Sequence, residues 1–127
     1  MTELLELKNL SRRFGGLKAL ENVSFSIGTG EVVGLIGPNG AGKTTLVNVI
    51  TGVHTATGGQ VLYQGTDITR YKPYQTARIG LSRTFQIVQP FPDLTVLDNV
   101  SAAALFSRSG FSIRQAQEFA QEQLEFV

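Results

Sequence analysis

The sequence predicts an α/β fold, and three observations support that prediction. The first third of the chain alternates apolar and polar residues, which is the pattern of half-buried strands. A nearly continuous apolar run, residues 31–36 (EVVGLI), leads directly into the glycine-rich stretch GPNGAGKTT at residues 37–45. A short apolar segment of helical character follows. A buried strand, a glycine-rich loop and a helix in this order are the start of a βαβ unit in a parallel sheet.

The first predicted elements follow from their local patterns. Residues 4–10 (LLELKNL) and 23–27 (VSFSI) are expected to be strands because both alternate. Residues 31–36 are expected to be a strand buried on both faces, since strands of a parallel sheet covered by helices are apolar throughout. Residues 44–51 are expected to form a helix that Gly52 stops, because glycine favours the position just after a helix.

The later elements alternate between loops, short strands and helix. Gly58 and Gly59 mark a turn before an expected strand at residues 60–63, and prolines mark loops around residues 77–89, where another strand is expected. From residue 94 onward the pattern is helical. One apolar helix face is predicted from Ile113, Ala116, Ala120, Leu124 and Val127. The solvated face of the same helix is predicted from Glu118, Glu122 and Glu125.

Length and composition exclude several classes of protein. The 127 residues suit one domain or part of one, and 42% hydrophobic residues is ordinary for a globular fold. Lys and Arg number 11 and Asp and Glu number 10, which argues against a dedicated nucleic-acid binder. There is no cysteine, so disulfides and thiolate chemistry are excluded. Without a signal-peptide pattern or an apolar run of about 20 residues, we expect a soluble, cytoplasmic protein.

Residues 37–44 match the Walker A pattern G-x-x-x-x-G-K-[ST] at every required position. Its glycines let the backbone curl so that successive N–H groups face one centre, and the following helix directs its positive end there. Lys43 is placed to reach the β- and γ-phosphates, and Thr44 offers a hydroxyl to Mg²⁺. The sequence therefore predicts a P-loop NTPase fold that binds a nucleoside triphosphate.

GPNGAGKTTL after VVGLI resembles the nucleotide-binding subunits of ABC transporters, over essentially the whole chain. Three further phrases narrow the resemblance to the ATPase subunits of branched-chain amino acid importers: FGGLKAL (14–20), RTFQ (83–86) and LTVLDNV (94–100). Importers of urea or short-chain amides share these phrases. The implied fold is an incomplete ABC-type nucleotide-binding domain with N-terminal antiparallel β strands and the start of the helical subdomain.

The resemblance also implies roles for individual residues. Phe14 would stack on the adenine ring, where a flat aromatic buries the base face without reading its edge. Gln86, in the glutamine loop, would help to hold Mg²⁺ and the attacking water and would sense the membrane subunit. The implied cofactors are ATP and Mg²⁺, with Thr44 and Gln86 at the metal. The full set expected at the nucleotide is Phe14, Gly37, Pro38, Asn39, Gly40, Ala41, Gly42, Lys43, Thr44, Thr45 and Gln86.

Hydrolysis needs groups that these 127 residues do not contain. A second Mg²⁺ ligand, a group that polarises water and charge stabilisation are required. In the family they come from an Asp-Glu pair, a later histidine and a Ser-Gly-Gly-Gln signature of the opposing subunit. Asp67 is expected in a loop, and His54, the one histidine, is expected to be an exposed loop residue. No catalytic residue is therefore expected here, and the chain alone is expected to be inactive.

The expected organisation has two parts. Residues 1–86 would be the N-terminal part of the ATP-binding core, with the β subdomain, phosphate loop and glutamine loop, and residues 87–127 the truncated start of the helical subdomain. A fragment of this kind would expose a sheet edge and apolar surface, so we expect it to be marginally stable or to self-associate.

The expected function is that of an ABC-type ATPase subunit that couples ATP binding and hydrolysis to import of a small solute, branched-chain amino acids foremost. Expected partners are a second ATP-binding subunit, in a homo- or heterodimer, and membrane permease subunits facing residues 86–100. No nucleic acid is expected. The permeases would hold the chain peripherally at the cytoplasmic face of the inner or plasma membrane.

Two other functions compete with this one. A truncated interaction module would bind nucleotide and partner without hydrolysis, and the missing Asp-Glu pair favours it for these residues. A phosphate-loop kinase or GTPase is disfavoured, because the sequence has neither Asn-Lys-x-Asp nor a basic lid cluster.

Overall fold

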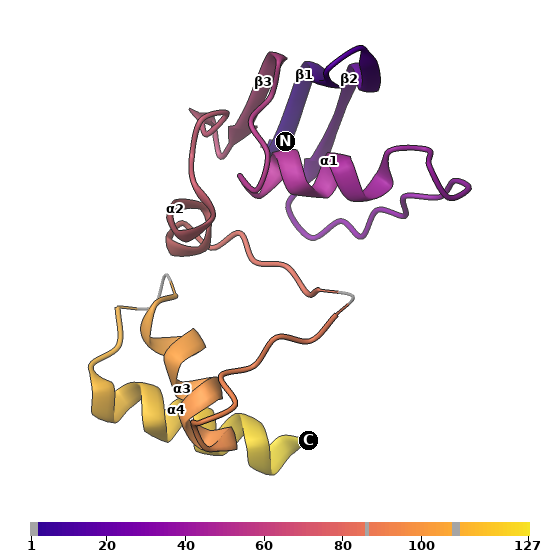
Figure 1. The fold of residues 1–127 in the computed structure, drawn as a ribbon. Helices are drawn as coiled ribbons and strands as arrows, with labels where there is room; N and C mark the ends of the chain where they lie inside the picture. The colour runs from indigo at the N-terminus through magenta and orange to yellow at the C-terminus, as the bar shows by residue number, and fades with distance from the viewer. Residues whose placement is uncertain (1–2, 86, 108–109) are drawn as a thin grey trace. The chain divides into compact units, whose positions relative to one another are not determined.

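The structure, a computed structural model, describes residues 3–85, 87–107 and 110–127. It divides into two compact units, Met1–Thr76 and Ala77–Val127. Figure 1 draws the first unit around a small sheet and the second around helices. The sequence-based boundary at residue 86 was drawn from motifs rather than from contacts, and it stays a prediction.

The first unit contains a four-stranded sheet in the order β2-β1-β3-β4, with every pair antiparallel. Its strands are β1 (Glu3–Phe14), β2 (Leu17–Gly28), β3 (Gly58–Tyr63) and β4 (Thr66–Asp67). The expected strands at 4–10, 23–27 and 60–63 fall inside β1, β2 and β3. Asp67, expected in a loop, instead ends β4, because the two-residue turn at Gln64 and Gly65 brings it back to pair with Leu62.

The core of the first unit lies between this sheet and α1 (Lys43–Ile50). In β1, Leu5 and Leu7 are buried, but the next buried residue is Leu10, which breaks the two-residue alternation. The pairing of β1 shifts register between Leu7 and Leu10, and Asn9 there has a φ of 50°. An extra residue at such a bulge restores the inward side of the strand. The other buried apolar residues are Leu20, Leu46, Val49, Val61, Tyr63 and Ile68.

Helix α1 is the predicted helix, within one residue at each end. Leu46 and Val49 are its buried residues, and Figure 1 shows it running beside the β1–β2 hairpin. Gly52, just beyond its end, has a φ of 88°, which agrees with the predicted stop.

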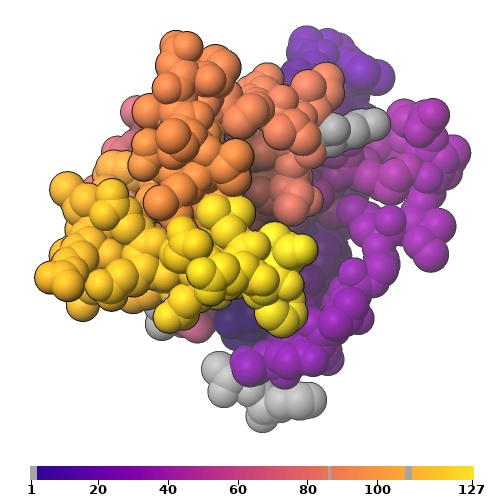
Figure 2. All heavy atoms as spheres, turned by 90° about the horizontal axis from the view of Figure 1, so that it is seen from below, coloured from indigo at the N-terminus to yellow at the C-terminus, as the bar shows by residue number. Residues whose placement is uncertain are grey.

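The predicted strand at residues 31–36 is wrong. The segment has no regular secondary structure, and it is exposed: Val32 by 100% and Ile36 by 96%. Figure 2 shows the purple stretch of chain that contains it open to solvent. A strand needs a neighbour to receive its N–H and C=O groups, and no described segment pairs with this one. The apolar pattern of a central strand is present without the strands that would flank it.

The strand expected within residues 77–89 is also wrong in the part that the structure describes. Residues 73–78 form α2 (Pro73–Arg78), and residues 81–85 and 87–89 lie outside helices and strands. The structure describes no neighbouring strand for them either.

The second unit is built on α3 (Val96–Leu105) and α4 (Ile113–Phe126), which pack against each other. Ala104, Ala116 and Ala120 are buried in this pair. The expected helical character after residue 94 is confirmed, and the three glutamates of α4 are exposed as expected. The buried face of α4 is narrower than predicted, since Ile113 is 67% exposed. Within the described ranges, no helix is both long and apolar enough to cross a membrane.

Candidate functional site

The glycine-rich loop ends on the helix as the motif predicts, with Gly42 as the N-cap of α1. Gly42 has a φ of 95°, a conformation that favours glycine. A Cβ added there would lie 2.8 Å from the carbonyl oxygen of Ala19 in β2. Both the local conformation and the neighbouring strand therefore require glycine at this position.

The first turn of α1 presents unsatisfied backbone donors. No side chain caps it, since the N-cap residue is a glycine. The first four N–H groups of any α-helix lack intrahelical acceptors, and the helix dipole adds partial positive charge. Lys43 and Thr44 occupy this turn, and the side chain of Thr44 is exposed. These donors fit the phosphates of a nucleotide, and the free hydroxyl fits the coordination sphere of a hydrated Mg²⁺.

The ammonium of Lys43 turns back onto the loop. Its Nζ donates to the carbonyl oxygen of Gly37 and, over 2.8 Å, to that of Pro38. The backbone N–H of Ala41 also donates to Pro38, over 3.1 Å. The cation is thus held against the backbone of the loop, and a cation in this position can complement an anion that binds the loop amides.

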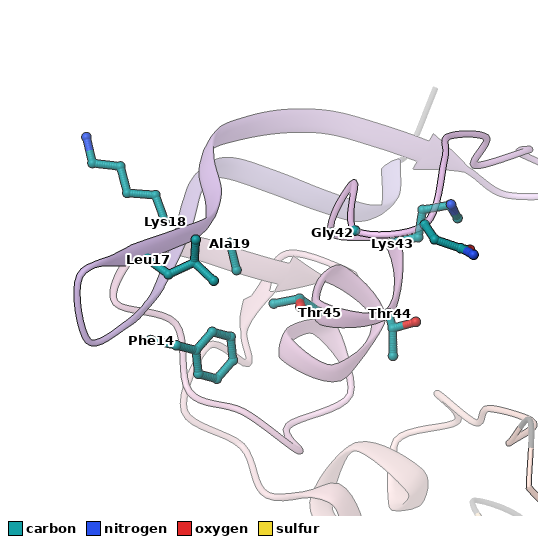
Figure 3. A pocket seen from close by; sticks show the side chains of 10 residues that line it. Phe14, Leu17, Lys18, Ala19, Gly42, Lys43, Thr44 and Thr45 are labelled. Carbon is teal, nitrogen blue, oxygen red and sulfur yellow. The ribbon is translucent and has the colours of Figure 1, made fainter.

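These groups share one pocket of about 360 Å³ within the first unit. Phe14 and Leu17 lie at one end of it and Lys43 at the other, while the ammonium of Lys18 points away (Figure 3). A pocket with an aromatic end and a cationic end suits a ligand with a flat base and a charged tail. The pocket is lined by Phe14, Leu17, Lys18, Ala19, Asn39, Gly40, Gly42, Lys43, Thr44 and Thr45.

Phe14 has two partners that the sequence did not reveal. The guanidinium carbon of Arg12 lies 4.5 Å from the centroid of the ring, and the ring of His54 meets it edge-on, with centroids 5.1 Å apart. His54 lies in a loop as expected, but it is not exposed there, because it is half-buried against Phe14.

Seven of the eleven residues predicted at the nucleotide line this pocket: Phe14, Asn39, Gly40, Gly42, Lys43, Thr44 and Thr45. Gly37, Pro38 and Ala41 belong to the loop but not to the lining. Gln86 lies outside the described residues. That these side chains bind nucleotide stays a prediction.

The sequence analysis missed three wall residues, Leu17, Lys18 and Ala19. The sequence feature that could have identified them is the short Gly-Gly turn after Phe14, because it directs the start of β2 back along the pocket. No group of three or more His, Cys, Asp or Glu side chains that could hold a metal occurs among the described residues.

A second polar hollow lies along β3 and β4, in the first unit, and is lined in part by Gln60, Asp67 and Thr69. Asp67 accepts from the backbone N–H of Thr69 over 2.9 Å and from its hydroxyl. Gln60 donates to the same carboxylate over 3.1 Å. These bonds, led by the Thr69 hydroxyl, lower the pKa of Asp67 below its ordinary value.

Comparison with known families and curated proteins gives consistent matches. The family model described as "ABC transporter" matches residues 20–127. The chain is 45% identical over 101 residues to the probable branched-chain amino acid transport ATP-binding protein LivG of Archaeoglobus fulgidus, covering 80% of this chain and 39% of that protein. It is 39% identical over 137 residues to the high-affinity branched-chain amino acid transport ATP-binding protein BraF of Pseudomonas aeruginosa, covering 98% of this chain and 54% of that protein.

Solved structures agree with these matches. The ADP conformation of an ATP-binding cassette of an ABC transporter superposes with a TM-score of 0.74 at 39% identity, covering 94% of this chain and 46% of that one. A dimeric post-hydrolysis cassette bound to ADP and Pi superposes with a TM-score of 0.76 at 29% identity, covering 95% of this chain and 56% of that one. The chain thus spans about half the length, or less, of the relatives it matches.

Proposed function

The chain belongs to the ABC transporter family, and on that basis we propose that it carries the nucleotide-binding part of an ATP-binding subunit that serves a branched-chain amino acid importer. Membership confirms the fold class predicted from the sequence, an ABC-type P-loop NTPase domain of which the chain covers a part. The proposed substrate follows from LivG of Archaeoglobus fulgidus and BraF of Pseudomonas aeruginosa, both of which are named branched-chain amino acid transport ATP-binding proteins.

One observation supports ATP binding most directly: the pocket joins an aromatic end at Phe14 to the glycine-rich loop and Lys43. The adenine would stack on Phe14, and the phosphates would receive N–H groups from the loop and first turn of α1 together with the ammonium of Lys43. Mg²⁺, which offsets phosphate charge when bound, would be held by the hydroxyl of Thr44 and by Gln86.

The proposed permease contact rests on residues 91–95. Phe91 is 60% exposed and Leu94 46% exposed, although both are large and apolar. Asn99 fixes their backbone: its amide donates to the carbonyl oxygen of Phe91 over 3.1 Å, and its oxygen accepts from the N–H of Phe91 over 2.8 Å. A loop that is held in place while presenting apolar side chains suits a protein partner. The partners we propose are a second ATP-binding subunit and membrane permeases, which would hold the chain at the cytoplasmic membrane face.

ATP binding is tested by calorimetric titration of the full chain with ATP and Mg²⁺. Lys43→Ala is expected to weaken ATP binding by about tenfold to a hundredfold, because it removes charge-assisted hydrogen bonds to phosphate. Lys72→Ala is the matched control, because that lysine is exposed and does not line the pocket. Absence of binding by the wild-type chain, or equal binding by all three proteins, would contradict the proposal.

We propose further that these 127 residues bind ATP without hydrolysing it, because the Asp-Glu pair that the family resemblance calls for is not among them. A phosphate-release assay on the purified chain is expected to show no turnover. Phosphate release that disappears in Lys43→Ala would refute this proposal.

The solute is tested in cells. Deletion of the gene that encodes the chain is expected to reduce uptake of labelled leucine, isoleucine and valine and to leave urea uptake unchanged. Reduced urea uptake with unchanged amino acid uptake would indicate instead that the chain serves an importer of urea or amides.

A further inference from the structure

The ring of Phe14 contacts a cation and a second aromatic ring. The guanidinium carbon of Arg12 stands 4.5 Å from the centroid, within the range of a cation–π interaction. The imidazole of His54 approaches at 82° with centroids 5.1 Å apart, an edge-to-face arrangement. Phe14 itself is 38% exposed, so the ring is only partly covered.

Both partners are themselves anchored. The Nη1 of Arg12 donates to the carbonyl oxygen of Thr55 over 2.6 Å. The backbone N–H of His54 donates over 3.1 Å to the carbonyl oxygen of Asn48, which belongs to α1. The loop after α1 therefore holds the two groups that contact Phe14.

The same loop is tied to the end of β1. The backbone N–H of Thr57 donates to the carbonyl oxygen of Ser11 over 2.8 Å, and the hydroxyl of Thr57 accepts from the N–H of Arg13 over 2.9 Å. Phe14, at the end of β1, is thereby fixed relative to α1, whose first turn carries Lys43. The aromatic end of the pocket and its phosphate end are connected through these bonds.

We propose that Arg12 and His54 are positioning residues for nucleotide binding, which clamp the Phe14 ring from behind so that only its pocket side is open to a base. Phe14 lines the pocket, whereas neither Arg12 nor His54 does, so both act from outside it. A ring held before the ligand arrives loses less rotational freedom on binding, which favours affinity. The inference rests on the proposed binding of ATP and adds to it two residues that would act through Phe14 rather than on the nucleotide.

The test compares ATP with inorganic tripolyphosphate, which has no base, on the full chain. Arg12→Ala and His54→Ala are each expected to lower ATP affinity by about twofold to tenfold, the range of one aromatic or cation–π contact. Tripolyphosphate affinity is expected to stay unchanged, which also shows that the phosphate loop remains folded. Arg13→Ala is the matched control: its side chain is exposed and has no contact with the ring.

A double-mutant cycle separates positioning from direct contact. In a Phe14→Ala background, Arg12→Ala and His54→Ala are expected to have no further effect on ATP affinity. An equal loss with and without Phe14, or an equal loss for tripolyphosphate, would overturn the clamp while leaving ATP binding intact. Failure of the wild-type chain to bind ATP more tightly than tripolyphosphate would instead refute the base site at Phe14, and the clamp with it.

A fluorescence measurement provides an independent test of the proposed role of Arg12. The chain has no tryptophan, so Phe14→Trp introduces a single tryptophan, whose emission can be excited selectively over that of the tyrosines. Saturating ATP is expected to quench its emission by stacking, and adding Arg12→Ala is expected to reduce that quench. An unchanged quench amplitude would contradict the proposed role of Arg12.

Discussion

At the scale of single residues, Asp67 shows how a small hydrogen-bond network affects ionisation. The hydroxyl and backbone N–H of Thr69 both donate to its carboxylate, and Gln60 adds a third donor. The Thr69 hydroxyl also accepts from the N–H of Val61 over 2.9 Å, which extends the network into β3. The three donors to the carboxylate, led by the Thr69 hydroxyl, favour its ionised form and lower the pKa of Asp67 from 3.8.

This shift predicts an acid-dependent contribution to stability. Because the pKa is lower in the folded chain than in the unfolded chain, the contribution is present above 3.8 and is lost as pH falls through the folded value. Asp67→Asn is expected to be less stable than the wild type at neutral pH, and the difference is expected to shrink in acid. Chemical denaturation over a pH series measures it. Asp93→Asn, an exposed acid in the other unit, serves as control, and a pH-independent difference would contradict the prediction.

Among the elements, the helices start at residues that local chemistry selects. Thr95 caps α3 by accepting from the N–H of Asp98 over 3.1 Å. Ser112 and Gln115 form a complete capping box at α4: the serine hydroxyl accepts from the N–H of Gln115 over 3.2 Å, and the glutamine side chain accepts from the N–H of Ser112 over 2.9 Å. The capping box stabilises α4, which gains little stability from burial because its buried face is narrow.

Removing this cap is expected to weaken α4. Ser112→Ala removes the acceptor for an otherwise unpaired N–H, at a cost of about 1 kcal/mol in the free energy of unfolding. Denaturant unfolding followed by circular dichroism measures the change. Gln117→Ala, at an exposed position of the same helix, is expected to be neutral. Equal stability of Ser112→Ala and the wild type would show that the capping box contributes nothing.

At the scale of the whole molecule, the electrostatic repulsion between copies of the chain is too weak to offset the attraction between their exposed apolar surfaces. The net charge is only +1, which gives little repulsion between copies. Residues 31–36 expose Val32 and Ile36 almost completely, together with half of Val33 and Leu35. An extended apolar segment with unpaired backbone groups is a surface on which chains can associate.

We therefore expect the chain to self-associate through residues 31–36. Val32→Lys is expected to shift the population toward monomer, because it adds charge to the segment without disturbing any buried contact. Size-exclusion chromatography with light scattering measures the mass in solution. Tyr74→Lys adds the same charge at a site 60% exposed elsewhere and is expected to change the mass little. A monodisperse wild-type monomer would disprove the expectation.

The sequence by itself determined the features that depend on neighbours a few residues away. The Walker A spacing placed Gly42 and Lys43 at the start of a helix, alternation located β1 and β2, and the glycine turn signal located β3. These features are readable because turn geometry, helix starts and side-chain alternation follow from local backbone conformation. The sequence motifs also indicated the family, and the comparisons with known proteins confirmed it.

Only the tertiary structure decided which segments meet. It left residues 31–36 without a partner strand, although their composition is that of a central strand. It placed His54 on Phe14, and Ala19 against Gly42. Each of these outcomes depends on chain segments far apart in the sequence. Strand pairing and ring contacts form only where a partner is present, and no local pattern specifies that partner.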